Sequence, residues 1–522
     1  MLSGSPSAGR STRLALAVAF SLVGPFGASP AIAQASGGFV EKADSTAIRT
    51  VWTAAQIQAF LPARGRFTFP QPYNTQGIRL TNSTDCDGAD CLTPLSAASG
   101  RNINNHRGSD TMLIFLGLRG AGPTLFSYNK VTDEVVKLGS LFDPSSPLAA
   151  QTGEGWYFSA TQPTKLYVSD GGAALLRYDV QARALETVFD VTARFGSDKA
   201  VSQMHSSDDD NVHSATLSDL ASHAVLGCLA YREDSRQFSY YPATGSFDEC
   251  QVDRSGRWLL IKENVDGAGG EDNRIIDLQT GSETLLLDRD GAAGPSDNGY
   301  GYMVAGDQLD GAPRAVRVWG FGGSPLPGTV VYHDAYVGTA GLGHLTHSNA
   351  QPGLAPSQQY ACGGDATTTV APRANEIVCF RLDGSLDALV VTQVMTDLNA
   401  AGGGNGDLKQ PRGSLDVTGR YFIWTSNMGG RRSDAFIVKV PAERLTGVSS
   451  PEASSDAAPP DVPRPQPATA SALPGPRPRS PGAGPAVSFP DPLQLPVATT
   501  LQVPLTAAYN LLNVPAKAAG SF

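Results

Sequence analysis

Short apolar runs separated by polar turns dominate the middle of the chain. A segment that reads as a tight turn followed by a β-rich strand recurs there at intervals of about 45 to 55 residues, with one longer gap. Its clearest copies are Asp253–Ile261 and Asp416–Trp424, in which Gly256 and Gly419 stand where such a turn requires a positive φ. The weaker copies are Asn105–Phe115, Ser159–Val168, Ser206–Ala215, Asp297–Val304 and His347–Cys362.

A second element follows most copies and predicts β-hairpins. Each consists of two apolar stretches joined by Thr-Gly, Asp-Gly or similar turn residues. Examples are Leu125–Val136, Leu176–Val180, Ile275–Leu285 and Ile377–Leu386. One hairpin with two flanking strands makes a four-stranded sheet, and sheets that recur at this period build a β-propeller.

Seven copies between Asn102 and Pro441 predict an all-β fold, a seven-bladed β-propeller of four-stranded antiparallel blades. We expect Phe67–Thr81 to supply the strand that closes the ring with the last blade, because closure hides a free sheet edge. A long two-sheet sandwich is the alternative. It does not predict the return of the same turn sequence at blade intervals.

The chain divides into four segments of different composition. From Pro451 onward it is rich in Pro, Ala and Ser, which predicts a disordered tail. The apolar stretch Leu493–Val514 is broken by prolines and is either a tether or docking peptide or part of that disorder. The predicted segments are a secretory signal peptide at 1–33, an N-terminal lead-in at 34–66, the propeller at 67–446 and a Pro/Ala-rich low-complexity tail at 447–522.

Composition and charge exclude several protein classes. With 41% hydrophobic residues, the 522-residue chain is too apolar for wholesale disorder, and its 57 Gly and 37 Pro are too many for a helical bundle. The formal net charge of −10 leaves no basic surface, so we expect no nucleic-acid partner.

The N-terminus reads as an export signal. Arg10 and Arg13 precede the apolar run Leu14–Val23, and Ala31-Ile32-Ala33 forms a small-residue cleavage site. The run is too short for a membrane anchor, and no other apolar stretch is long enough to span a bilayer. Residues 1–33 carry two Arg and no acidic residue, so cleavage after Ala33 changes the charge from −10 to −12. The predicted location is periplasmic or secreted.

The six cysteines fit an exported protein. An even number favours disulfides, and neighbour pairing closes short loops or links adjacent strands, although six cysteines allow fifteen connectivities. A zinc site at the first pair is disfavoured because no second pair stands at zinc-site spacing. The expected disulfides are Cys86–Cys91, Cys228–Cys250 and Cys362–Cys379.

The two clearest turn segments, Asp253–Ile261 and Asp416–Trp424, resemble the blade motif of TolB-like and WD40-like propellers. In that motif a Ser-x-Asp-Gly-Lys type turn separates the first two strands of a blade. Most other copies here lack either the Gly or the Asp. The resemblance covers roughly two-thirds of the chain and implies the fold alone, since this architecture hosts unrelated functions.

Aligning the copies on their turns gives one column of inner-strand residues that would face a common funnel. The column contains Ser159, His205, Gln251, His347 and Ser414. Imidazoles bind metals and move protons near neutral pH, and an arginine can hold a carboxylate. We predict catalytic roles for His205, His347 and Arg412, ligand binding by His106, Arg107, Gln251 and Asn349, and a divalent metal ion on His344 and His347.

Two considerations weigh against that chemistry. A channel needs hydrogen-bonded polar lining, which His, Ser and Gln supply without reacting. Blades 3 and 6 lie nearly opposite in a seven-membered ring, so His205 and His347 would need help from His106 or His344 to share a metal. The acidic clusters at residues 85–90, 208–210 and 288–290 invite a calcium interpretation, but none matches an EF-hand loop and solvated turns are the favoured explanation.

Two function classes follow. The first is a non-catalytic module that binds a glycan or an envelope protein partner through the funnel. The second is a polysaccharide lyase, by analogy with lyase families such as the oligogalacturonate lyases, which use propellers with His, Arg and sometimes a metal in the channel. β-Elimination needs a base for the proton α to a uronate carboxylate and a cation beside that carboxylate. The acidic net charge opposes a polyanionic substrate, and a lactonase-type hydrolase would need carboxylates such as Glu263 and Asp297 at the funnel.

Overall fold

A computed structural model describes residues 35–445, except 87–100, 105, 107–108, 152, 154, 269, 291–292, 308–314, 325–326, 334–344, 365, 402–408 and 431. The signal peptide predicted at 1–33 and the disordered tail predicted at 447–522 lie outside the described residues. Among the described residues, no helix has the length and apolar character that crossing a membrane requires.

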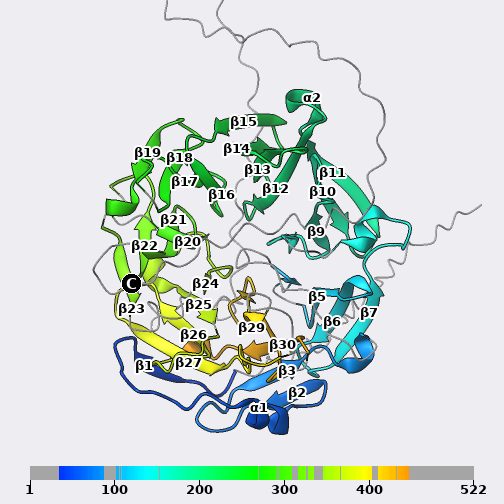
Figure 1. Cartoon of the computed structure of the whole chain (residues 1–522), viewed down its shortest axis with the longest axis vertical. Helices are drawn as coiled ribbons and strands as arrows, with labels where there is room; N and C mark the ends of the chain where they lie inside the picture. Colours follow the sequence, from blue (N-terminus) through cyan, green and yellow to red (C-terminus); the bar gives the residue numbers. More distant parts are fainter. Residues whose placement is uncertain are drawn as a thin grey trace, which may run out of the picture. The chain divides into compact units, whose positions relative to one another are not determined.

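The described strands form seven sheets arranged as the blades of a propeller (Figure 1), which confirms the predicted fold class. Each sheet is antiparallel, and the first strand of each blade lies nearest the centre. Blades 1 to 3 contain β4 (Ile103–Asn104), β5 (Thr111–Leu118), β6 (Gly122–Asn129) and β7 (Val135–Ser140); β8 (Tyr157–Phe158), β9 (Lys165–Val168), β10 (Ala174–Asp179) and β11 (Ala184–Asp190); and β12 (Lys199–Ser206), β13 (Val212–Asp219), β14 (Val225–Arg232) and β15 (Gln237–Pro242).

The remaining blades follow in chain order. Blades 4 to 7 contain β16 (Ser246–Val252), β17 (Trp258–Asn264), β18 (Asp272–Asp277) and β19 (Glu283–Leu286); β20 (Ala293–Asn298), β21 (Tyr302–Asp307), β22 (Ala315–Gly320) and β23 (Thr329–His333); β24 (Leu345–Thr346), β25 (Tyr360–Gly364), β26 (Glu376–Arg381) and β27 (Asp387–Gln393); and β28 (Gly413–Leu415), β29 (Tyr421–Ser426) and β30 (Asp434–Lys439). Within the described part of the chain, the α-helices are α1 (Ala54–Phe60) and α2 (Thr192–Phe195).

The repeated turns form where the sequence predicts them, between the first two strands of a blade. In blade 4 the carboxylate of Asp253 accepts hydrogen bonds from the backbone N–H groups of Arg257 and Trp258, and Gly256 has φ +71°. In blade 7 Asp416 accepts from the N–H of Tyr421 in the same way. An acidic residue at the start of the turn therefore satisfies donors that the following strand leaves unpaired.

The N-terminal region completes two blades. Strand β3 (Gln76–Arg79) pairs with β30, and β2 (Gly65–Thr68) pairs with β3, which confirms the predicted ring closure. Strand β1 (Phe39–Lys42) adds a fifth strand to blade 6 by pairing with β27. Blade 7 is thus built from residues far apart in the chain, as the blue and orange strands in Figure 1 show.

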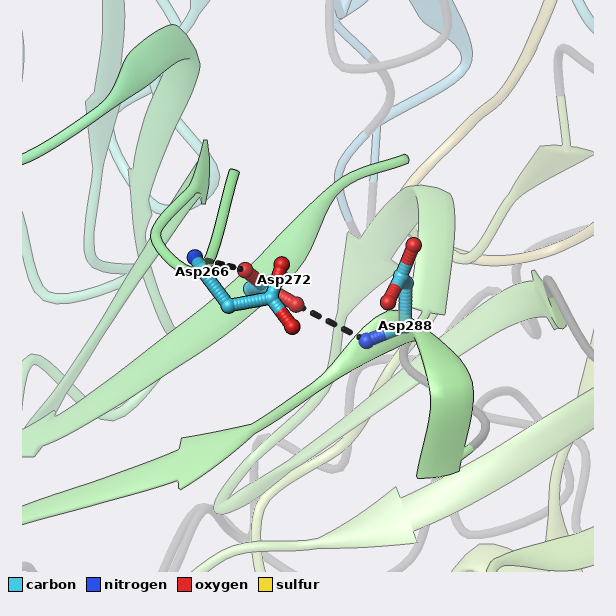
Figure 2. Close-up of side chains that lie close together, drawn as sticks. All are labelled: Asp266, Asp272 and Asp288. Atoms are coloured by element: carbon cyan, nitrogen blue, oxygen red, sulfur yellow. Dashed lines mark hydrogen bonds between the residues drawn. The ribbon is translucent and has the colours of Figure 1, made fainter. Parts of the chain in front are cut away.

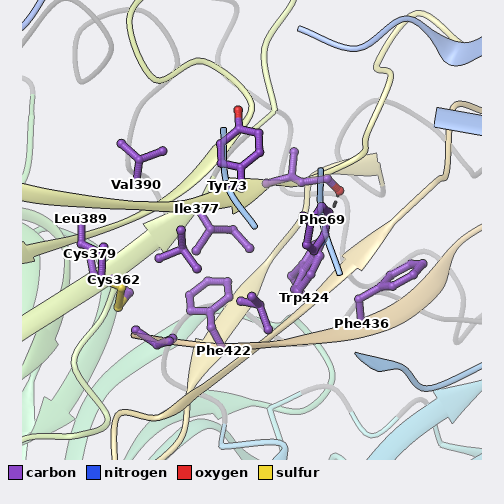
Figure 3. Packing of buried hydrophobic residues seen from close by; sticks show 14 of the residues in the cluster. Phe69, Tyr73, Cys362, Ile377, Cys379, Leu389, Val390, Phe422, Trp424 and Phe436 are labelled. Atoms are coloured by element: carbon purple, nitrogen blue, oxygen red, sulfur yellow. Dashed lines mark hydrogen bonds between the residues drawn. A yellow bond between two sulfur atoms is a disulfide. The ribbon is translucent and has the colours of Figure 1, made fainter. Parts of the chain in front are cut away.

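The largest core cluster lies where blades 6 and 7 meet this N-terminal region. Trp424 is fully buried against Phe69 and Phe436, and its indole N–H donates to the carbonyl of Val394 (Figure 3). The strands of one blade do not pair with those of the next, and aromatic side chains fill the space between the sheets. Packing between blades therefore adds cohesion that strand pairing does not supply.

Two of the three expected disulfides are confirmed. Cys362–Cys379 joins the paired strands β25 and β26, and Cys228–Cys250 joins β14 of blade 3 to β16 of blade 4. Cys91 of the third expected pair lies outside the described residues. These bonds fit a protein of an oxidising compartment such as the periplasm or the cell exterior.

Candidate functional site

A polar cavity opens where the inner strands of blades 2 to 5 approach the residues that precede blade 1. Its volume is about 20 Å³, room for one or two ordered water molecules. We call it the central cavity. Its lining consists of Arg101, Tyr157, His205, Ser206, Gln251, Val252, Arg254, Asp297 and Asn298.

β-Bulges set the direction of these side chains. The register of β12 shifts between Ser202 and His205, where Gln203 has φ +48° and accepts a hydrogen bond from the hydroxyl of Thr216 at 2.7 Å. The inner strands of blades 4 and 5 carry similar shifts. A bulge turns the following residues relative to the sheet, and three consecutive inner strands therefore depart from regular pairing close to the cavity.

A buried charge network holds one side of the cavity. Arg254 donates to Asp297 at 3.0 Å and to Asp208 at 3.3 Å, while Arg101 donates to Asp208 at 2.9 Å. The hydroxyl of Tyr300 also donates to Asp208 at 2.9 Å. Burial alone would lower the pKa of Arg254, but the carboxylates of Asp297 and Asp208 raise it. The network therefore keeps two fixed cations and two fixed anions at the cavity wall.

His205 contributes an imidazole without a partner. It is partly exposed to the cavity, and no side chain or backbone group within the described ranges forms a hydrogen bond with its ring. Burial lowers its pKa to about 4, despite the opposing influence of Glu249 and Asp297. At neutral pH the ring is uncharged, so a lone pair is available for a proton or a metal ion.

His347 is placed differently, although it belongs to the same sequence column. Its fully buried ring lies 2.6 Å from the hydroxyl of Tyr302, 3.0 Å from the carbonyl of Tyr360 and 3.2 Å from the side-chain oxygen of Asn349. Its backbone N–H donates to Asp297 at 2.6 Å. His347 therefore supports the cavity wall through Asp297, while its imidazole is occupied by other partners.

The other predicted site residues have varied positions. Gln251 lines the cavity, donates to Glu249 at 3.0 Å and accepts from Asn298 at 3.3 Å. His106 and Arg412 are described but do not line the cavity. Arg107 and His344 lie outside the described residues, so the predicted His344–His347 metal pair has no described geometry.

The sequence analysis did not assign several residues that line the cavity. They include Arg101, Tyr157, Ser206 and Arg254. Arg254 could have been found from the sequence, because it follows Asp253, the acidic residue of the clearest turn copy, directly after the predicted inner strand. Arg101 carried no such signal, because its partner Asp208 lies two blades away in the sequence.

An acidic cluster lies elsewhere, on blade 4. Asp266, Asp272 and Asp288 bring carboxylate oxygens within 4.8 Å of one another (Figure 2). Asp272 already accepts backbone N–H groups of Val265, at 2.7 Å, and of Asp288, at 2.8 Å. The cluster therefore fastens two loop ends, and none of its members lines the central cavity.

Comparison with known proteins shows the fold. No family model matches the chain, and no curated protein matches it. An oligogalacturonate lyase from Vibrio parahaemolyticus is similar in structure, with a TM-score of 0.52 and 10% identity over 73% of this chain and 100% of that one. An oligogalacturonate lyase in complex with manganese gives a TM-score of 0.52 and 12% identity over 74% and 100%. TolB from Acinetobacter baumannii aligns with a TM-score of 0.31 and 11% identity over 52% and 61%.

Proposed function

We propose that the protein is an exported propeller that binds a glycan through the central cavity. The observation that carries this proposal is the set of polar groups there: two guanidiniums, a phenol, a hydroxyl, two primary amides, the carboxylate of Asp297 and the imidazole of His205, which has no hydrogen-bond partner among the described residues. Sugar hydroxyls and carboxylates are recognised by such groups when they are held in place before binding. The small cavity volume means that one substituent of a sugar would enter, with the ring outside.

The charge network supports an acidic substituent in particular. Asp208 and Asp297 hold Arg101 and Arg254 in fixed orientations, so little side-chain entropy is lost when a ligand binds. Each guanidinium has five donors, and a carboxylate accepts several hydrogen bonds. A uronate carboxylate therefore fits the wall better than a neutral hydroxyl does.

Calorimetric titration of the mature protein with uronate and neutral oligosaccharides tests this proposal. We expect binding of the uronates that weakens at least about tenfold in Arg101→Gln and in His205→Gln. Arg257→Gln is the matched control, because Arg257 is a half-exposed turn residue paired with Asp277 outside the cavity. Binding that is absent, or that is equal in all variants, would contradict the proposal.

A second candidate function is β-elimination on the same ligand, favoured by the state of His205. A neutral imidazole with a free lone pair can remove the proton α to a uronate carboxylate, while an adjacent guanidinium stabilises the developing charge. The two similar lyase structures give this candidate further support.

The ultraviolet absorbance of unsaturated uronate products distinguishes the two candidates. A lyase produces this signal, His205→Gln abolishes it, and a parallel reaction with added manganese shows whether a metal contributes. Ligand binding without any unsaturated product would leave the binding module as the function.

A further inference from the structure

A chain of hydrogen bonds leads from the central cavity into the space between blades 2 and 3. The hydroxyl of Tyr157 lies 2.7 Å from that of Ser206, which lies 2.6 Å from Nδ1 of His213. Nε2 of His213 lies 2.9 Å from the carboxylate of Glu233. We propose that Ser206 is a nucleophile for small carboxylic esters, with His213 as its general base and Glu233 as the residue that positions His213.

The proposal requires a resting state in which Glu233 is ionised and His213 is neutral, and this state fixes the hydrogens of the chain. An ionised Glu233 can only accept, so Nε2 of the neutral ring carries the hydrogen and Nδ1 carries the lone pair. Ser206 must then donate to Nδ1, and Tyr157 donates to the oxygen of Ser206. The serine proton therefore already points at the base that would remove it, which is the arrangement that activates a serine.

Glu233 is held in its charged form. Burial raises its pKa, but the hydrogen bond from His213 and the charge of Arg177, 2.8 Å away, outweigh burial and lower it. An anion at this position orients the imidazole and stabilises the imidazolium that forms when Ser206 gives up its proton.

Strand pairing brings the three residues to one end of blade 3. Ser206 ends β12 and is directly opposite His213 on β13, and Glu233 follows the last residue of β14. The bulge at Gln203 precedes Ser206 in the same strand. Ser206 and His213 thus come from paired strands of one sheet, and Glu233 lies in the turn directly after the next strand of that sheet, so the sheet holds the first two and anchors the third.

Access to Ser206 is through the central cavity. Ser206 is 7% exposed and lines the cavity together with Tyr157 and Arg101. A volume of about 20 Å³ admits an acyl group no larger than acetyl. Within the described ranges, Arg101 uses one of its five donors on Asp208, so further N–H groups at this wall can stabilise an oxyanion.

The proposed reaction balances without any cofactor. The oxygen of Ser206 bonds to the ester carbonyl carbon as its proton passes to Nδ1 of His213. The carbon–oxygen bond to the alcohol then breaks, and the alcohol leaves with that proton. Water adds to the acyl-serine and gives a proton to His213, the carboxylic acid leaves, and the proton returns to Ser206.

Labelling with methanesulfonyl fluoride, whose methylsulfonyl group is close to acetyl in size, followed by intact mass and peptide mapping, tests this inference. The probe forms a serine oxygen–sulfur bond and releases fluoride, so it reports an activated serine without requiring the natural ester. We expect one label on the mature protein, located on Ser206 and absent in Ser206→Ala. Ser169→Ala is the matched control, because Ser169 is equally buried, at 8% exposed, and its hydroxyl accepts from the N–H of Gly171.

Glu233→Gln distinguishes the effect of the carboxylate charge on the reactivity of Ser206 from an effect on the fold. The amide keeps an acceptor for Nε2 but loses the charge. We therefore expect Ser206 of the folded variant to be labelled at least about tenfold more slowly. Hydrolysis of p-nitrophenyl acetate should fall in parallel. Absence of any label on Ser206 in the folded protein, or equal labelling in Glu233→Gln, would overturn the inference; neither result bears on glycan binding.

Discussion

His205 and His347 come from the same column of the sequence repeat, yet their imidazoles have opposite surroundings. The ring of His205 faces the central cavity without a partner among the described residues, whereas Tyr302, Tyr360 and Asn349 surround the ring of His347. Of the five residues in the column, His205 and Gln251 line the cavity, whereas Ser159, His347 and Ser414 do not. The sequence could not predict which of the two imidazoles remains free of hydrogen-bond partners, because this depends on Tyr302 of the neighbouring blade.

The buried neutral state of His347 makes stability depend on pH. Its pKa is lowered from 6.5 in the unfolded chain to about 4 by burial. Above pH 6.5 the ring is neutral in both states, but as the pH falls the unfolded chain takes up a proton that the folded chain refuses. The free energy of unfolding should therefore decrease between pH 6.5 and 4, with about 3 kcal/mol from His347.

Urea denaturation across this pH range measures the effect. His347→Gln cannot take up the proton, so its unfolding free energy should vary less steeply, by up to about 1.4 kcal/mol per pH unit. His205 contributes in the same direction and remains in the variant. If the unfolding free energies of the two proteins varied with pH in parallel, His347 would take up its proton as readily in the folded state as in the unfolded state, which would contradict the prediction.

The charge network also makes a prediction for a single arginine. Arg254→Met removes a partner of both Asp208 and Asp297 and leaves buried charge uncompensated, at a cost of about 3 to 5 kcal/mol in unfolding free energy. Arg257→Met, three residues later, removes a pair with Asp277 whose arginine side chain is 45% exposed, and should cost clearly less because water screens this pair. Chemical denaturation of both variants gives the comparison, and similar losses would contradict it.

At the scale of elements, the turns and hairpins of the repeat were predictable because their chemistry is local. The Asp253 and Asp416 turns depend on residues within five positions in the chain. The bulge in β12 was not predictable, since Gln203 is held there by Thr216 of the paired strand. The triad of Ser206, His213 and Glu233 was hidden for the same reason, because strand pairing brings it together.

Alanine substitutions at two glycines distinguish how much backbone strain and how much steric overlap lower the free energy of unfolding. Gly281 has φ +72° with open space where a Cβ would lie, so Gly281→Ala should cost about 1 kcal/mol. Gly419 has φ +74°, and a Cβ there would overlap the hydroxyl of Tyr360, so Gly419→Ala should cost at least about 2 kcal/mol more. Thermal and urea unfolding measure both, and equal losses would exclude the steric contribution.

At the scale of the whole molecule, the ring is held closed by strands from its two ends. The expectation that Phe67–Thr81 supplies a closing strand followed from the need to cover a sheet edge, and β3 does so. The addition of β1 to blade 6 could not be predicted, because Arg49 and Glu376, which lie 2.7 Å apart across this junction, are distant in the sequence.

A charge placed in the closing strand should open the ring. Ile78 is fully buried on β3 opposite Ile437, so Ile78→Asp places a carboxylate in the core and should cost at least about 4 kcal/mol. Val40→Asp is the control, because Val40 on β1 is 41% exposed. Gel filtration and binding of a hydrophobic dye should report an expanded or aggregated Ile78→Asp protein, and a compact cooperative one would show that β3 is dispensable.

Closure by distant strands also imposes an order on how the molecule is made. Strands β2 and β3 emerge early from the ribosome or the export channel, but β30, the partner of β3, emerges only after all of the first six blades. Strand β3 can pair with β2 at once, but its other edge stays unpaired until the last blade is present. A chain interrupted before β30 lacks the strand that pairs with β3, so the ring can close only after synthesis has continued through that strand, which ends at Lys439.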